Sequence, residues 1–142
     1  MTDQAEYQAL LRGVPLFSGV PDSSLEKVTA LATDVTHDAG HVIVHQGKSR
    51  AHALHVIISG KASVSAGGKR IATLGPGDYF GEIAIVGRTE RTATVTATTE
   101  LRVIAIDATS FRRLVRNDPS LAATLPDVIA ERLEDLDDKL GE

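Results

Sequence analysis

The sequence predicts a mainly β fold, an antiparallel β-roll or jelly roll with helices before and after it. From Val35 onward, apolar residues alternate with a period of two, which is typical of strands. Turn-forming residues separate these short runs at close intervals. Helical patterns do not return until residue 107, whereas parallel strands would need crossover helices between them. These three observations together favour antiparallel strands.

Residues 1–34 are predicted to form an N-terminal helical segment. Residues 4–12 carry apolar side chains at helical spacing, and Pro15 ends that helix. A second helix should follow, because Ser23 and Glu26 have the spacing of a capping box at a helix start.

Residues 35–106 are predicted to form the roll. Gly67 and Gly68 separate two strand-like runs and are typical of a tight hairpin turn. In residues 92–98, threonines on one face alternate with alanine and valine on the other. The small side chains of the second face would let backbone or ligand come close to it. The predicted strands are residues 42–45, 53–59, 62–66, 70–74, 92–97 and 101–106.

Residues 107–142 are predicted to form C-terminal helices. Asp107 can cap a helix over residues 108–116, and Pro119 suits the first position of the next helix. Residues 127–140 place isoleucine and leucine in a narrow stripe that resembles a short coiled-coil seam. This stripe makes a homodimer through the last helix an open expectation.

Composition limits the classes of function. A chain of 142 residues fits a single domain with its own core. The net charge of −4 at pH 7 argues against direct binding of nucleic acid. No apolar run approaches the roughly 20 residues that a membrane helix needs, so no membrane partner is expected. The absence of cysteine excludes disulfides and fits a cytoplasmic protein.

The stretch from Gly75 to Val95 carries the candidate site. Free backbone N–H groups at the start of a predicted helical turn, residues 81–84, suit an anion. Arg91 can grip two phosphate oxygens at once, and the Glu82 carboxylate can accept a hydrogen bond from a sugar hydroxyl. A phosphate and a hydroxyl held by one short loop describe a compact nucleotide.

The sequences Phe80–Ala84 and Arg91–Val95 resemble the phosphate-binding cassette of the cyclic nucleotide-binding domain family. This family includes the catabolite activator protein and the regulatory subunits of cAMP-dependent protein kinase. The similarity covers residues 14–130, and its other landmarks are Gly47, Gly60 and Gly75–Asp78.

The resemblance implies a role for each residue of the cassette. Arg91 and the amides of Ile83 and Ala84 would hold the cyclic phosphate, and Glu82 would take the ribose 2′-hydroxyl. Thr92 would add a hydrogen bond. Positions on two strands would line the base. The predicted ligand-binding residues are Val64, Ile71, Ala72, Gly81, Glu82, Ile83, Ala84, Arg91, Thr92 and Ala93.

The implied function is that of a regulatory sensor rather than an enzyme. Its ligand would be cAMP, with cGMP as the alternative, and no cofactor is expected. Ligand binding would reposition the C-terminal helices to act on a regulated partner protein or domain. The lid over the base would be aliphatic, with Ile129 and Leu133 as candidates, or would come from a second subunit.

Three alternatives remain open at this point. The chain can be the sensor piece of a larger transcription factor or enzyme that a cyclic nucleotide regulates. The second alternative is a degenerate domain that no longer binds a ligand, and the presence of both Glu82 and Arg91 argues against it. A small jelly-roll enzyme of the cupin type would need a His-x-His metal pair, which the sequence lacks.

The histidines are not expected to bind a metal. His37, His41 and His45 would share one face of an extended run, with successive members about 13 Å apart. That spacing is too long for a common ion. His52 and His55 would lie on opposite faces of a strand.

Overall fold

The computed structural model describes residues 4–44, 53–81 and 94–124. Within these ranges the helices are α1 (Gln4–Arg12), the 3₁₀ helix η1 (Pro15–Phe17), α2 (Asp22–Thr29), α4 (Ala108–Asn117) and α5 (Pro119–Thr124). The strands are β1 (Ala32–His37), β2 (Val42–Val44), β3 (Ala53–Ser59), β4 (Ala62–Ala66), β5 (Lys69–Leu74), β6 (Tyr79–Gly81), β7 (Thr94–Ala97) and β8 (Leu101–Asp107).

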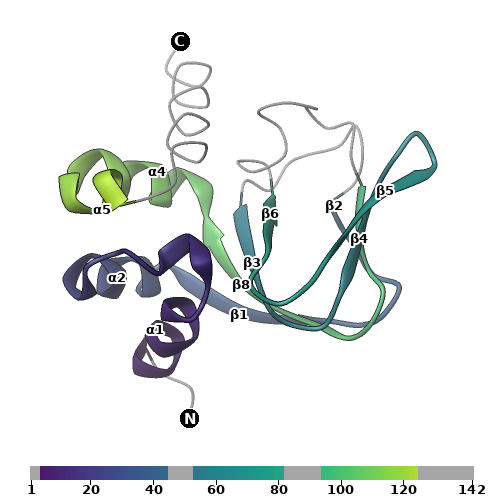
Figure 1. Cartoon of the computed structure of the whole chain (residues 1–142), viewed down its shortest axis with the longest axis horizontal. Coiled ribbons are helices and arrows are strands. Elements are labelled where there is room, and N and C mark those ends of the chain that lie inside the picture. The colour runs from purple at the N-terminus through teal and green to yellow at the C-terminus, as the bar shows by residue number, and fades with distance from the viewer. Residues whose placement is uncertain (1–3, 45–52, 82–93, 125–142) are drawn as a thin grey trace.

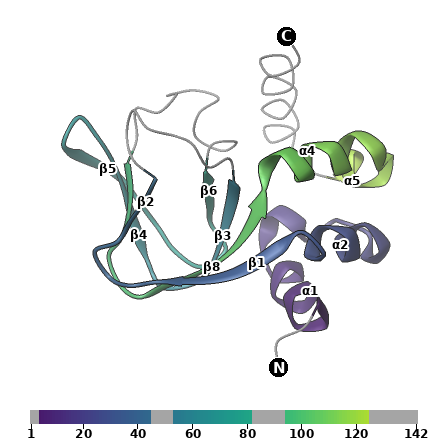
Figure 2. The same cartoon turned by 180° about the vertical axis from the view of Figure 1, so that it is seen from behind.

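The strands form two antiparallel sheets of four strands each. The first has the order β1-β8-β3-β6, and the second has the order β2-β7-β4-β5. The helices from both ends of the chain gather on one side of the first sheet, and the second sheet lies on its other side (Figure 1). The view from behind shows the same arrangement (Figure 2). The predicted antiparallel roll with flanking helices is therefore confirmed.

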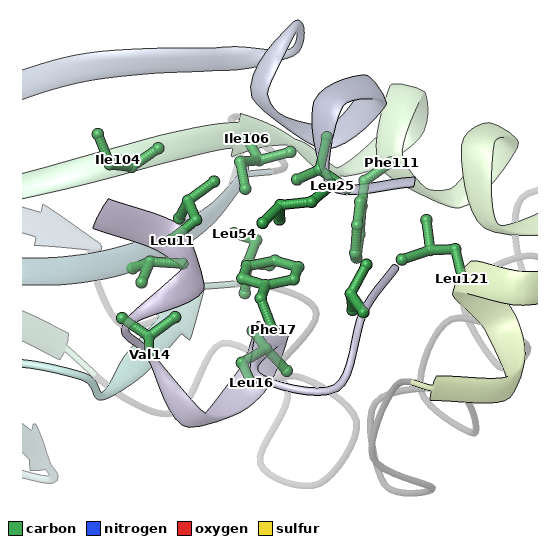
Figure 3. Close-up of a cluster of buried hydrophobic side chains, with 13 residues drawn as sticks. Leu11, Val14, Leu16, Phe17, Leu25, Leu54, Ile104, Ile106, Phe111 and Leu121 are labelled. Atoms are coloured by element: carbon green, nitrogen blue, oxygen red, sulfur yellow. The ribbon is translucent and has the colours of Figure 1, made fainter. Parts of the chain in front are cut away.

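An apolar core joins the helices to the outer face of the first sheet (Figure 3). Leu54 from β3 and Ile104 from β8 are fully buried in this core. The Phe17 and Phe111 rings meet edge to face, with centroids 6.2 Å apart. Since Phe17 precedes the roll and Phe111 follows it, this contact ties the N-terminal helices to the C-terminal ones.

A buried carboxylate makes a second tie between the two helical segments. Asp118, only 7% exposed, accepts hydrogen bonds from the Ser24 hydroxyl at 2.9 Å and the Leu121 amide at 3.2 Å. The Lys27 ammonium lies 3.5 Å from the same carboxylate. The Leu121 amide, the Ser24 hydroxyl and Lys27 all favour the charged form, so the pKa of Asp118 is lowered. This contact fixes α2 against the start of α5.

Most predicted elements occur where the sequence places them. Strands β3 and β4 have the predicted bounds, and Gly67 and Gly68 form their predicted hairpin turn, with φ of +59° and +82°. The Asp107 carboxylate caps α4 by accepting a hydrogen bond from the Ser110 amide at 2.9 Å. The final predicted helix, residues 127–140, lies outside the described residues.

The start of α2 corrects one prediction. The helix begins at Asp22 with Pro21 as its N-cap residue, and no side chain caps it, so the Ser23–Glu26 capping box is wrong. The Leu25 amide donates to the Pro21 carbonyl at 2.9 Å, which places Ser23 inside the first turn. The roll also begins earlier than residue 35, because β1 starts at Ala32.

Candidate functional site

A second apolar core lies in the interior of the roll, between the two sheets. Ile57 and Val103 enter it from the first sheet, and Val64 and Val95 enter it from the second. Each of these four side chains is at most 7% exposed. The inner faces of both sheets are therefore apolar along most of their length.

The three predicted base-lining residues lie on β4 and β5. Val64 points into the interior and pairs with Val95 on one side and Ala72 on the other. Because directly opposed residues share a face, Ala72 continues the inner surface toward the edge of the sheet. Ile71 falls at a register shift and is 58% exposed. The structure therefore brings Val64 and Ala72 together on one face, and the contact of any of the three residues with a base stays a prediction.

Strand β6 leads into the predicted cassette. Gly81 is its last residue and pairs with Leu54, and the rest of the predicted helical turn, residues 82–84, lies outside the described residues. The extended backbone follows from pairing with β3, which the sequence pattern does not reveal. The other cassette residues lie outside the described residues: Glu82, Ile83, Ala84, Arg91, Thr92 and Ala93.

A tight turn before β6 explains the Gly-Pro-Gly-Asp sequence. The Asp78 carboxylate accepts a hydrogen bond from the Gly75 amide at 2.8 Å, and the Asp78 amide donates to the Gly75 carbonyl at 3.0 Å. Gly77 has φ of +90°, and its amide donates to the Ile57 carbonyl at 2.9 Å. The turn therefore holds the entry to β6 in register with β3.

Gly60 meets a different structural need. It has φ of +93° in the turn between β3 and β4, and a Cβ there would collide with the carbonyl oxygen of Glu100. Only glycine fits this position without a backbone shift. Gly47, the remaining landmark glycine, lies outside the described residues.

His55 is a candidate functional residue that sequence reasoning missed. Its ring stacks on Phe80 with centroids 4.8 Å apart and planes 14° apart. Burial, and to a smaller extent the charge of His37, lowers the pKa of His55 to about 4. The period-two pattern from Ala53 to Ser59 could have placed His55 on the face of Ile57, but not against an aromatic ring.

The expected spacing of the first two histidines is wrong. The chain turns between β1 and β2, where the His41 amide donates to the Asp38 carbonyl at 3.0 Å and Gly40 has φ of +91°. The His37 and His41 rings therefore stack, with centroids 4.9 Å apart. The described part of the chain holds no cluster of three or more side chains suited to a metal ion.

Among the described residues, two surface cavities lie beside the helices. One, of about 300 Å³, lies between α2 and α4, with Lys27 and Arg113 at its edge. The other, of about 280 Å³, lies between the end of α1 and the Pro76–Gly77 turn. Neither includes a predicted ligand-binding residue.

In the described ranges, no helix is long and apolar enough to cross a membrane.

Comparison with known sequences identifies relatives among regulatory proteins. The cAMP-dependent protein kinase regulatory subunit of Schizosaccharomyces pombe is 35% identical over 121 residues, which cover 84% of this chain and 29% of that protein. The CRP-like cAMP-activated global transcriptional regulator of Mycobacterium tuberculosis is 29% identical, over 94% of this chain and 61% of that protein. The chain spans about a third of the length of the regulatory-subunit relatives.

Solved structures show the same fold. The N-terminal domain of a transcriptional regulator from Streptomyces coelicolor A3(2) superposes with a TM-score of 0.70 at 28% identity, covering 91% of this chain and 95% of that one. A cAMP-bound PfPKA-R structure gives a TM-score of 0.73 at 26% identity, over 97% of this chain and 47% of that one.

A family model covers more than half of the chain. The model for the cyclic nucleotide-binding domain matches residues 34–118, which include most of β1, all of β2 to β8 and the segment between β6 and β7. This match agrees with the roll, the inner apolar face and the glycine turns described above. The chain belongs to the cyclic nucleotide-binding domain family.

Proposed function

We propose that this domain binds a 3′,5′-cyclic nucleotide inside the roll, with cAMP as the first candidate and cGMP as the second. The observation that carries the proposal is that β6, the strand in which the cassette sequence begins, has Phe80 in the apolar core on the inner face of the roll. Relatives named for cAMP regulation, and a neighbour solved with cAMP bound, support the choice of ligand.

Arg91 pairs with the cyclic phosphate, and the Ile83 and Ala84 amides donate to the same group. Glu82 accepts a hydrogen bond from the ribose 2′-hydroxyl, which selects against deoxy analogues. A guanidinium and a carboxylate thus read two different parts of one ligand. Val64 and Ala72 offer a shared inner surface on which a base can lie.

The domain acts as a sensor, not as an enzyme, and its output passes through the C-terminal helices. Helix α4 follows β8 directly, and Phe111 and Asp118 tie this region to the N-terminal helices. Ligand binding shifts the population between two arrangements of these helices, by no more than the ligand's difference in affinity for them. A regulated partner protein, a linked domain or a second copy of the chain receives the signal.

The test is calorimetric titration with cAMP of the wild type, Arg91→Ala and the control Arg88→Ala. Arg88 carries the same charge in the same segment, so Arg88→Ala controls for the loss of one positive charge there. Arg91→Ala should weaken binding by about 2–5 kcal/mol, as expected for a desolvated charge pair. Arg88→Ala should bind nearly as the wild type does. Equal affinities for Arg91→Ala and the wild type would refute the assignment.

A further inference from the structure

His55 is a polar side chain on the largely apolar inner face of the first sheet. Its neighbours along β3, Leu54 and Val56, face the core beneath the helices, so His55 faces the opposite way. Its cross-strand partners are Ala105 on β8 and Phe80 on β6. Phe80 belongs to the core between the two sheets, which places the imidazole in the interior of the roll.

The imidazole presents an unsatisfied nitrogen there. The Nδ1 atom of His55 is buried and has no hydrogen-bond partner among the described residues. Stacking on Phe80 holds the ring plane, so the nitrogen cannot turn freely toward water. A buried polar atom without a partner is costly, and native structures rarely leave one unused.

The position of His55 relates it to one part of the predicted ligand. Phe80 and Gly81 end β6, and Glu82 follows them directly. The predicted base-lining residues Val64 and Ala72 lie on the other sheet. His55 therefore lies next to the strand that enters the cassette, where the sugar and phosphate are expected.

We propose that His55 is a specificity-determining residue that contacts the sugar–phosphate part of a bound cyclic nucleotide through Nδ1. The inference rests on the proposed function, since it requires a nucleotide inside the roll. It adds a contact from β3, outside the cassette, to those expected from Glu82 and Arg91.

The contact has a consequence for the protonation of His55. Among the described residues, the titratable groups on neighbouring elements include His37 at the end of β1, His41 in the following turn, Tyr79 on β6 and Asp107 at the end of β8. The Asp107 carboxylate accepts a hydrogen bond from the Ser110 amide at the start of α4. Because burial and His37 disfavour the imidazolium, a phosphate anion close to His55 will raise its pKa when the ligand binds.

The charges of Asp34 and Arg102 do not reverse this expectation. They lie on the opposite face of the first sheet, where the Arg102 guanidinium donates to the Asp34 carboxylate at 2.7 and 3.0 Å. Nucleotide binding is therefore linked to uptake of a proton by His55. If the pKa rises by about two, affinity increases by up to roughly tenfold from pH 7 to pH 5.

The experiment compares cAMP titrations of the wild type, His55→Phe and the control His41→Phe at pH 7. Phenylalanine keeps an aromatic ring against Phe80 and removes only the nitrogens. His55→Phe should weaken binding by roughly three- to tenfold, the range for one hydrogen bond. His41 is exposed, so its replacement should leave the affinity unchanged. Equal affinity in His55→Phe and the wild type would overturn the inference.

A second measurement needs no variant of His55. The pKa of His55 is followed by NMR in the wild type, with and without saturating cAMP, and should be higher with the nucleotide. A His55 signal that neither shifts nor changes its titration would overturn the inference, even where the variant does not fold. A wild type that binds neither cAMP nor cGMP would instead refute the proposed function, and the His55 contact with it.

Discussion

Replacing His55 by phenylalanine should remove much of the acid sensitivity of the fold. His55 is held neutral inside the roll, with a pKa of about 4 against 6.5 for an unperturbed histidine. Between these two values the unfolded chain binds a proton more readily than the folded chain does. The free energy of unfolding therefore falls as the pH drops through this window.

The size of the effect follows from the shift. Each pKa unit is worth about 1.4 kcal/mol, so the full loss attributable to His55 is about 3 kcal/mol below pH 4. At pH 5 most of it, about 2 kcal/mol, is already present relative to pH 8. This is a large part of the stability of an ordinary small domain.

Urea unfolding curves at several pH values between 8 and 5 provide the assay, for the wild type, His55→Phe and His41→Phe. The wild type and His41→Phe should lose stability steeply over this range, and His55→Phe should lose markedly less. Asp118 does not interfere, because its lowered pKa acts only below 3.8. Equal slopes for His55→Phe and the wild type would refute the assignment of a neutral, buried imidazole.

Four further variants, one of them a control, probe the fold. Gly60→Ala should lower the free energy of unfolding in urea by about 2–3 kcal/mol, because the added Cβ would collide with a backbone carbonyl oxygen. The control Gly67→Asn, at an open turn position, should lower it much less. Phe111→Ala should cost about 3–5 kcal/mol by the same assay, and a loss below 1 kcal/mol would contradict its place in the core. Asp118→Ala should lower the Tm by leaving the Ser24 hydroxyl without its acceptor, and this difference should shrink as the pH falls below 3.8.

Local sequence signals predicted the elements that local chemistry determines. The hairpin at Gly67 and Gly68 needs positive φ at both positions, and the α4 cap needs a carboxylate at Asp107, so both could be predicted. Strand β1 could not be predicted in this way, because Thr33 and Thr36 are exposed and the strand is held in place by pairing with β8. The stacked pair of His37 and His41 depends on a turn at Gly40 that an extended run conceals.

The candidate site shows the same difference between contacts that local sequence predicts and contacts that depend on the fold. Val64 and Ala72 share the inner surface that the strand pattern predicts, because pairing between β4 and β5 follows from the hairpin. The contact of His55 with Phe80 joins β3 to β6, two strands without a short connection, and only the fold reveals it. The roles of Glu82 and Arg91 rest on the cassette sequence and stay predictions.

Calorimetric titration of the wild-type domain with cAMP, and with 5′-AMP as the control, shows whether the roll binds a cyclic nucleotide. We expect saturable binding of one cAMP for each chain and much weaker binding of 5′-AMP, whose phosphate is not cyclised. Absence of binding by both cAMP and cGMP to the folded domain would contradict the proposal that this roll is a cyclic-nucleotide sensor.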